Sequence, residues 1–272
     1  MVVKSFKQHP IEEKHLLQTR TKAETDQRMN VVIQGAGRGI GLALAHRARV
    51  SGANHLFLTA REPTSSQGFA DLPPGPDITW LALDNLVPNS IEEAGEQIQS
   101  KVDKLDRVIC CSGVLKDEIV APEKRLADID AGALTYVYQV NATGPILLAK
   151  ALLPTLRGNH SLHFASISAR VGSISDNQLG GWYAYRASKA AQNQLMRTLS
   201  IEMTRYNPNT CVTTLHPGTV DTALSKPFQA HVHQDSLFTT ESSAAMLWSV
   251  LDRLKPTDTG GFFAYDGKPI PF

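Results

Sequence analysis

The stretch that decides the fold is Val31-Val32-Ile33-Gln34-Gly35-Ala36-Gly37-Arg38-Gly39-Ile40-Gly41. Its first three residues are typical of a short buried strand, and Leu42–Val50 continues as a helix. Glycines between a strand and a helix allow a tight turn and let the backbone approach a pyrophosphate, whose charge the helix N-terminus stabilises. The stretch therefore predicts a nucleotide-binding turn in the first strand–helix unit of an α/β domain.

Five further apolar runs continue this pattern along the chain: His55–Thr59, Ile78–Leu83, Val108–Cys111, Leu162–Ser166 and Cys211–Leu215. Helical stretches over Val137–Leu156 and Tyr185–Arg205 separate the later runs. Largely continuous apolar strands that alternate with helices indicate a parallel sheet covered on both faces. We expect a single doubly wound Rossmann-type α/β domain over residues 30–272.

Composition excludes several classes of protein. The 272 residues carry 27 Lys and Arg against 26 Asp and Glu, so no long-range field attracts nucleic acid or an anionic membrane. No apolar run approaches the roughly 18 residues of a membrane span. Three cysteines are too few for a disulfide framework and fit a reducing compartment. We expect a cytoplasmic protein without nucleic-acid or membrane partners.

Two segments stand apart from the regular pattern. Residues 1–29 are expected to form a flexible, solvated extension, and Met29, just before the first strand, is an alternative start. Ala223–Thr240, with Leu224, Phe228 and Phe238, is predicted to cover the substrate as a lid.

The end of the second strand indicates which nucleotide is bound. In NAD enzymes a carboxylate there binds the adenosine ribose hydroxyls, but this strand ends Leu58-Thr59-Ala60-Arg61. A guanidinium at Arg61, helped by Arg38 in the glycine turn, is suited to a 2′-phosphate. NADP is therefore the predicted cofactor, and two surface arginines without a ligand are the alternative.

Tyr185 and Lys189 form the second motif. Four residues apart on a helix, their side chains share one face and can address one site. A free tyrosine has a pKa near 10, and a neighbouring ammonium together with a positively charged nicotinamide favours its ionised form. The spacing is common by itself, but beside a nucleotide-binding turn it indicates a proton-exchanging pair.

The turn Gly35-x-x-x-Gly39-x-Gly41 and the Tyr185/Lys189 pair together resemble the short-chain dehydrogenase/reductase family, from Asn30 to the C-terminus. Ala169–Asn177, Gly180–Tyr185 and Gly260–Gly267 resemble its C-factor/sniffer-like carbonyl reductase branch. The resemblance implies an NADPH-dependent oxidoreductase that transfers a hydride between the nicotinamide and a carbonyl or alcohol substrate, with Tyr185 as general acid/base. It also implies a homodimer or tetramer, because the two long helices form dimer faces in this family.

The resemblance assigns further residues. Asn141 is similar to the asparagine that supports a water-linked proton relay, Asp84 to an aspartate near the adenine ring, and Pro217–Thr222 to a segment at the nicotinamide end. The expected cofactor-binding residues are Gly35, Gly37, Arg38, Gly39, Ile40, Gly41, Arg61, Asp84, Gly113, Tyr185, Lys189, Pro217, Gly218, Val220 and Thr222. No metal site is predicted.

Two departures from the family pattern matter. Cys110-Cys111-Ser112-Gly113 replaces the usual Asn-Asn-Ala-Gly, so cofactor contacts there are expected from the backbone, and the cysteines are interpreted as small buried apolar residues. Counting back from Gly172, Ala169 occupies the position of the catalytic hydroxyl.

Ser168, one residue earlier than Ala169, would face the other side of a strand. Either the loop holds one extra residue and Ser168 serves, or the hydroxyl is absent. Ser168 is the favoured candidate, with Ser166 as the fallback. The same departures leave open an alternative function, a nucleotide-binding signalling or scaffold protein that has lost catalysis, which the intact Asn141, Tyr185 and Lys189 oppose.

Overall fold

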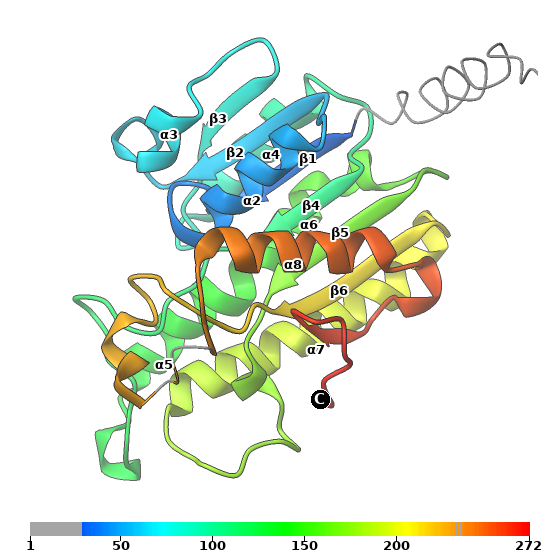
Figure 1. Ribbon diagram of the computed structural model, residues 1–272. Helices are drawn as coiled ribbons and strands as arrows, with labels where there is room; N and C mark the ends of the chain where they lie inside the picture. The colour runs from blue at the N-terminus through cyan, green and yellow to red at the C-terminus, as the bar shows by residue number, and fades with distance from the viewer. Residues whose placement is uncertain (1–28, 232, 234–235) are drawn as a thin grey trace, which may run out of the picture.

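A computed structural model describes residues 29–231, 233 and 236–272, so the predicted extension, apart from Met29, lies outside the described residues. The described chain forms a doubly wound α/β fold around a seven-stranded parallel sheet with strand order β3-β2-β1-β4-β5-β6-β9 (Figure 1). The predicted fold class is confirmed. The strands are β1 (Asn30–Gln34), β2 (His55–Ala60), β3 (Ile78–Ala82), β4 (Arg107–Cys110), β5 (Leu162–Ile167), β6 (Thr210–His216) and β9 (Phe262–Ala264).

Two sets of helices cover the sheet. On the face turned to the viewer in Figure 1 lie α2 (Gly39–Val50) and α8 (Thr240–Arg253). On the other face lie α4 (Pro88–Gln99), α6 (Gly144–Leu156) and α7 (Tyr183–Tyr206). Strand residues alternate between two cores, since Ile33 packs with Leu44 and Trp248 on one face, while Val32 packs with Phe164 on the other. Both faces are therefore buried, which explains the continuous apolar runs.

The remaining elements are short. They comprise α3 (Gln67–Asp71), α5 (Ala131–Tyr138), and the strands β7 (Thr219–Val220) and β8 (Leu237–Phe238), which pair with each other. Strand β7 precedes the predicted lid, and β8 lies near its end.

The long helix predicted over residues 137–156 is interrupted. After α5, the residues Gln139–Thr143 form a π-helical turn before α6 begins at Gly144. Before the turn Val137 packs in a small cluster with Val114 and Ala184, whereas Leu148 after it packs in the core beneath the sheet. Both segments are apolar, so the sequence alone predicts one continuous helix. We call Gln139–Thr143 the π turn, since it carries Asn141.

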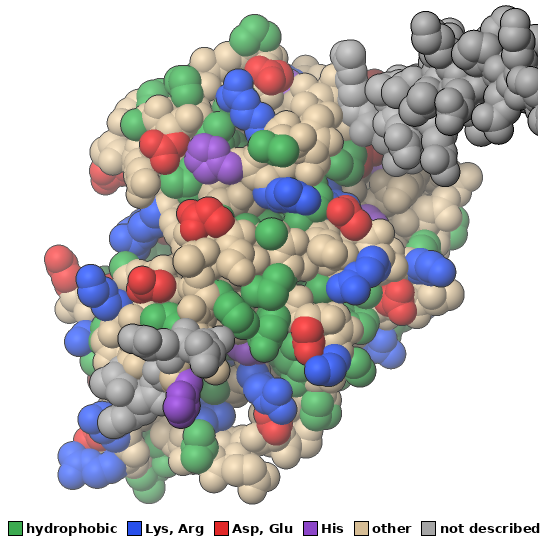
Figure 2. Space-filling view, in the orientation of Figure 1, with side chains coloured by type: hydrophobic (Ala, Val, Ile, Leu, Met, Phe, Trp, Pro, Cys, Tyr) green, Lys and Arg blue, Asp and Glu red, His purple; other side chains and the backbone are tan. Residues whose placement is uncertain are grey.

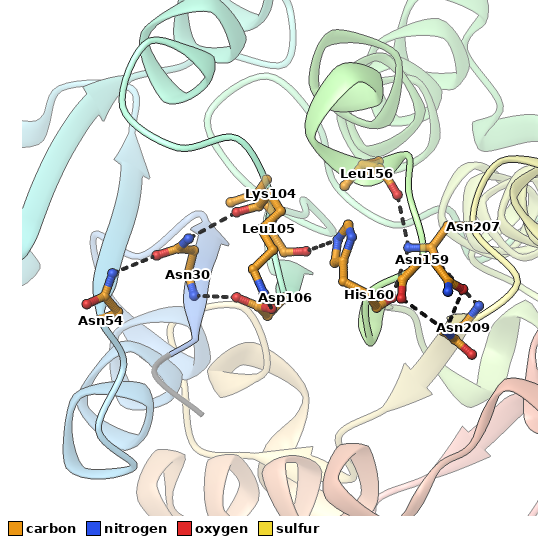
Figure 3. Close-up of polar contacts among 10 residues, drawn as sticks. All are labelled: Asn30, Asn54, Lys104, Leu105, Asp106, Leu156, Asn159, His160, Asn207 and Asn209. Carbon is orange, nitrogen blue, oxygen red and sulfur yellow. Dashed lines mark hydrogen bonds and ion pairs between the residues drawn. The ribbon is translucent and has the colours of Figure 1, made fainter. Parts of the chain in front are cut away.

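Asparagine side chains form hydrogen bonds between loops at the edge of the sheet where the parallel strands begin (Figure 3). Asn30 of β1 accepts a hydrogen bond from Asn54 (3.2 Å) and donates to the carbonyl of Lys104 (3.0 Å). Asn207, after α7, donates to the carbonyls of Leu156 (3.2 Å) and His160 (3.0 Å). These contacts satisfy backbone groups that helix and strand ends leave open. Hydrogen bonds within the chain thus stabilise the loops at this edge of the sheet.

Of the helices that the structure describes, none is both long and apolar enough to cross a membrane. On the face shown in Figure 2, acidic and basic side chains are interspersed over the surface.

Candidate active site

The glycine turn has the geometry expected for holding an anion. Gly35 and Gly39 have positive φ angles of 79° and 60°, and a Cβ on Gly41 would overlap the carbonyl oxygen of Gly35. Arg38, which precedes α2, makes no capping hydrogen bond from its side chain, and the first turn of α2 contains no acidic residue. The N–H groups that begin this helix are therefore directed at a site suited to a phosphate.

The ends of β4 and β2 and the predicted cofactor residue Thr222 lie close to this turn. A Cβ on Gly35 would lie 2.7 Å from Ser112 Oγ, after β4. One on Gly37 would lie 3.2 Å from Cβ of Ala60, at the end of β2, and one on Gly39 would lie 3.6 Å from Thr222. The strand order reverses direction between β1 and β4, which is where doubly wound sheets open their ligand crevice.

Arg61 lies in a charged neighbourhood at the end of β2. Burial raises the pKa of the Asp117 carboxyl, but hydrogen bonds from Tyr136 and from the Val120 and Ile119 N–H groups, together with the positive charge of Arg61, bring that pKa below its ordinary value. Arg61 is exposed, and its charge reaches the loop that follows β4. Asp84 accepts a hydrogen bond from its own loop, at Leu86 N–H (2.9 Å).

Tyr185 and Lys189 lie buried in the first turns of α7. Tyr185 is 7% exposed and Lys189 is 3% exposed, and Lys189 Nζ lies 5.8 Å from the centre of the Tyr185 ring. The ammonium donates to Ile167 O and to Gln192 Oε1, both at 2.9 Å. Burial raises the pKa of Tyr185 and lowers that of Lys189 to about 7, against a smaller opposing effect of Cys111.

The lowered pKa of Lys189 predicts a pH-dependent stability. Between about pH 7 and 10.5 the unfolded chain holds a proton on this lysine that the folded chain has lost. Folding stability therefore rises with pH across this window, by at most about 1.4 kcal/mol per pH unit for one proton. In urea unfolding of the cofactor-free protein, we expect wild type to gain stability relative to Lys189→Met between pH 7 and 9. Parallel curves for the two proteins would contradict the assignment.

Asn141 is fully buried and its side chain makes three hydrogen bonds, two to Val114 and one to Ser188. Its Oδ1 accepts from Val114 N–H (2.7 Å), and its Nδ2 donates to Val114 O (2.9 Å) and to Ser188 Oγ (3.0 Å). A Cβ on Gly113 would lie 3.4 Å from Asn141 Oδ1 and 3.6 Å from Lys189 Nζ. Gly113 therefore lies next to the predicted catalytic residues Asn141 and Lys189, and the preceding residue, Ser112, lies next to the glycine turn.

The Ser168 hydroxyl is engaged by Asn193 of α7. The chain stays extended through Ala169 (φ −144°, ψ 149°), so no extra residue turns Ser168 toward the site. Ser168 Oγ donates to Asn193 Oδ1 at 2.7 Å, and Asn193 lies eight residues, or about 12 Å along α7, beyond Tyr185. Ser166 Oγ accepts from Gln192 on the same helix. This geometry favours the alternative in which Ala169 replaces the catalytic hydroxyl.

The two cysteines after Ile109 behave as apolar residues. Both thiols are free; Cys110 is buried in β4 and Cys111 is partly exposed. Burial raises the pKa of both, that of Cys111 to about 12. These thiols therefore stay protonated at neutral pH.

Sequence reasoning missed Glu123, which holds the start of α7. Glu123 is 5% exposed; its carboxylate accepts from Ala184 N–H (3.2 Å), and its carbonyl accepts from Trp182 N–H (2.6 Å). Trp182 has a left-handed backbone (φ 52°) and packs against Tyr185 and Phe228, with ring centres 6.2 and 5.0 Å away. No spacing in the sequence links Glu123 to a helix some 60 residues later.

A cavity of about 530 Å³ opens at the carboxyl ends of β6 and β9. Arg170, His216 and Tyr265 line it, together with Phe238 of the lid segment. Neither Tyr185 nor Lys189 lines this cavity.

The family model for short chain dehydrogenases matches residues 29–233. The chain belongs to the short-chain dehydrogenase family. It is 35% identical to the C-signal protein of Myxococcus xanthus over 148 residues, which is 54% of this chain and 83% of that protein. NADPH-bound carbonyl reductase from chicken fatty liver and the carbonyl reductase Sniffer of D. melanogaster both superpose with a TM-score of 0.78, at 27% and 25% identity, covering 90% of this chain and 99% of theirs. The predicted family and branch are thereby confirmed, and the chain is an oxidoreductase by family.

Proposed function

We propose that the protein is an NADPH-dependent carbonyl reductase that also runs in the alcohol-oxidising direction. The observation that carries this proposal is that Asn141 Oδ1 and Lys189 Nζ both lie beside Gly113, with the Tyr185 ring centre 5.8 Å from that ammonium. The likeness to an NADPH-bound carbonyl reductase supports it.

Each residue has a chemical task in this proposal. The cofactor, when bound, supplies the hydride chemistry. Tyr185 donates a proton to the carbonyl oxygen of the substrate, and its burial keeps the phenol protonated until a nearby positive charge favours release. Lys189 in its protonated form provides that charge and binds the nicotinamide ribose, and Asn141 holds a water that returns protons to Tyr185.

The remaining expected residues bind and orient the cofactor. The glycine turn and the N-terminus of α2 hold the pyrophosphate, Arg61 and Arg38 hold the 2′-phosphate, Asp84 approaches the adenine, and Pro217–Thr222 contacts the nicotinamide end. Their support is the uncapped start of α2 and the absence of a carboxylate at the end of β2. Residues 223–240 act as the substrate lid, and the free thiols support a cytoplasmic location.

The direct test is oxidation of NADPH with a panel of aldehydes, ketones and quinones. Turnover of at least one carbonyl, with NADPH preferred over NADH, is the expected result. Tight NADPH binding without turnover of any member would instead favour the scaffold protein, which the alanine at position 169 makes the second candidate.

A hydroxyl at position 169 should improve the enzyme. We expect Ala169→Ser to raise kcat by about tenfold, because a donor aimed at the developing oxyanion stabilises the transition state. Ser168→Ala distinguishes the alternatives: it should lower stability by about 1–3 kcal/mol, since Asn193 loses its partner. A loss of turnover in Ser168→Ala without a gain in Ala169→Ser would restore Ser168 as the catalytic hydroxyl.

A further inference from the structure

The carbonyl oxygen of Val140 lies in the π turn, directly before Asn141, and lacks its usual helical partner. In an α-helix the N–H four residues later would bind it, but Gly144 N–H donates to Gln139 O instead. The following residue is Pro145, which has no N–H to donate. A buried carbonyl without a donor is costly, so the π turn depends on a donor from elsewhere in the chain.

Asn85 supplies this donor from the segment after β3. Its side chain is 7% exposed, and its Nδ2 donates to Val140 O at 2.7 Å. Its Oδ1 accepts from Nε2 of Gln34, a fully buried residue at the end of β1, also at 2.7 Å. Because a carbonyl can only accept, the contact with Val140 fixes which end of the Asn85 amide faces the turn. The amide thus connects the central strand of the sheet to the backbone beside Asn141.

The space that Asn85 occupies depends on Gly144. A Cβ on Gly144 would overlap the amide group of Asn85. Gly144 is the first residue of α6, so the helix begins where this side chain passes. The close packing of Asn85 on Gly144 and the hydrogen bonds of its amide both show a specific contact between the segment after β3 and the π turn.

We infer that Asn85 is a positioning residue for Asn141, an inference that rests on the proposed function. By holding Val140 O, it keeps the π turn open at the residue whose amide binds Val114 and Ser188. Those contacts set Asn141 Oδ1 beside Gly113 and hence beside Lys189. Asn85 acts through the backbone of the turn.

The test compares Asn85, which contacts the backbone just before α6, with Asn207, which contacts the last residue of α6. Asn85→Leu removes the donor, and the near-isosteric Asn85→Asp keeps an acceptor for Gln34 while its ionised carboxylate cannot donate to Val140. Asn207→Leu is the control, because Asn207 is likewise a buried asparagine and donates to the carbonyl of Leu156, at the opposite end of α6 (Figure 3).

In enzyme assays of folded protein, both Asn85 variants should lose at least about tenfold in kcat, because a small displacement of a catalytic group is costly. Their Kd for NADPH should stay within about twofold of wild type, whereas Asn207→Leu should lose stability and keep its kcat. Equal kcat in the Asn85 variants and the control would reduce Asn85 to a structural residue and overturn the inference.

Hydrogen exchange supplies a readout that does not need turnover. Peptides covering residues 139–144 should exchange faster in both Asn85 variants than in wild type or in Asn207→Leu. Unchanged exchange there would overturn the inference even if activity falls. A wild-type protein that reduces no carbonyl would defeat the proposed function instead, and the exchange result would then decide alone whether Asn85 holds the π turn.

Discussion

Tyr185→Phe is expected to lower kcat for carbonyl reduction by about 10²–10⁴-fold, the range that a positioned general acid contributes. The substitution removes only the hydroxyl, and the phenyl ring still fills the buried site against Trp182. We therefore expect the Kd for NADPH to stay within about twofold of wild type. Initial rates of NADPH oxidation and a fluorescence titration of the cofactor measure the two quantities separately.

Tyr183→Phe is the matched control for this experiment. Tyr183 begins the same helix, is 40% exposed, and has an alanine four residues later in place of a lysine. Its variant should keep wild-type rates. If Tyr185→Phe lost cofactor binding and turnover to the same extent, Tyr185 would be a structural residue and the proposed mechanism would be wrong.

Arg61→Asp should reverse the choice of nicotinamide cofactor. We expect the ratio of kcat/KM for NADPH to that for NADH to fall by at least about a hundredfold, because a charged hydrogen bond to the 2′-phosphate is lost and a repulsion replaces it. The new carboxylate would also lie near Asp117, whose pKa the Arg61 charge now helps to lower. Steady-state kinetics with both cofactors at fixed carbonyl concentration give the ratio.

Arg49→Asp makes the same change in net charge at the other end of α2, away from the glycine turn. Its cofactor ratio should remain that of wild type, which separates a local contact from the field of the whole protein. A ratio that is unchanged in Arg61→Asp would exclude Arg61 as the 2′-phosphate ligand.

Most strands of the sheet and the position of the glycine turn could be predicted, because apolar runs and glycine spacing are patterns within short stretches of sequence. All six expected strands are present, and the glycine turn lies where the sequence indicated. The strand β9 escaped prediction because only three residues form it. The helix α8 begins at Thr240, where the expected lid ends, and its apolar face becomes clear only when it packs on α2.

The site was predictable where one motif carries the chemistry and unpredictable where distant segments meet. Tyr185 and Lys189 share a helix face, so their spacing sufficed. The orientation of Ser168 toward Asn193 depends on how β5 packs against α7. The contact of Asn85 with Val140 and that of Glu123 with Ala184 join segments more than 50 residues apart, and no local pattern encodes them.

The aromatic contacts of Trp182 link the shape of the substrate to the acidity of Tyr185. Trp182 lies between Phe228 of the lid segment and the ring of Tyr185. The raised pKa of Tyr185 comes from burial. We expect a substrate that displaces Phe228 from Trp182 to let water approach Tyr185, which would lower the pKa of the phenol. Enzymes selected for bulkier carbonyls on this scaffold would shift their pH optimum as well as their specificity.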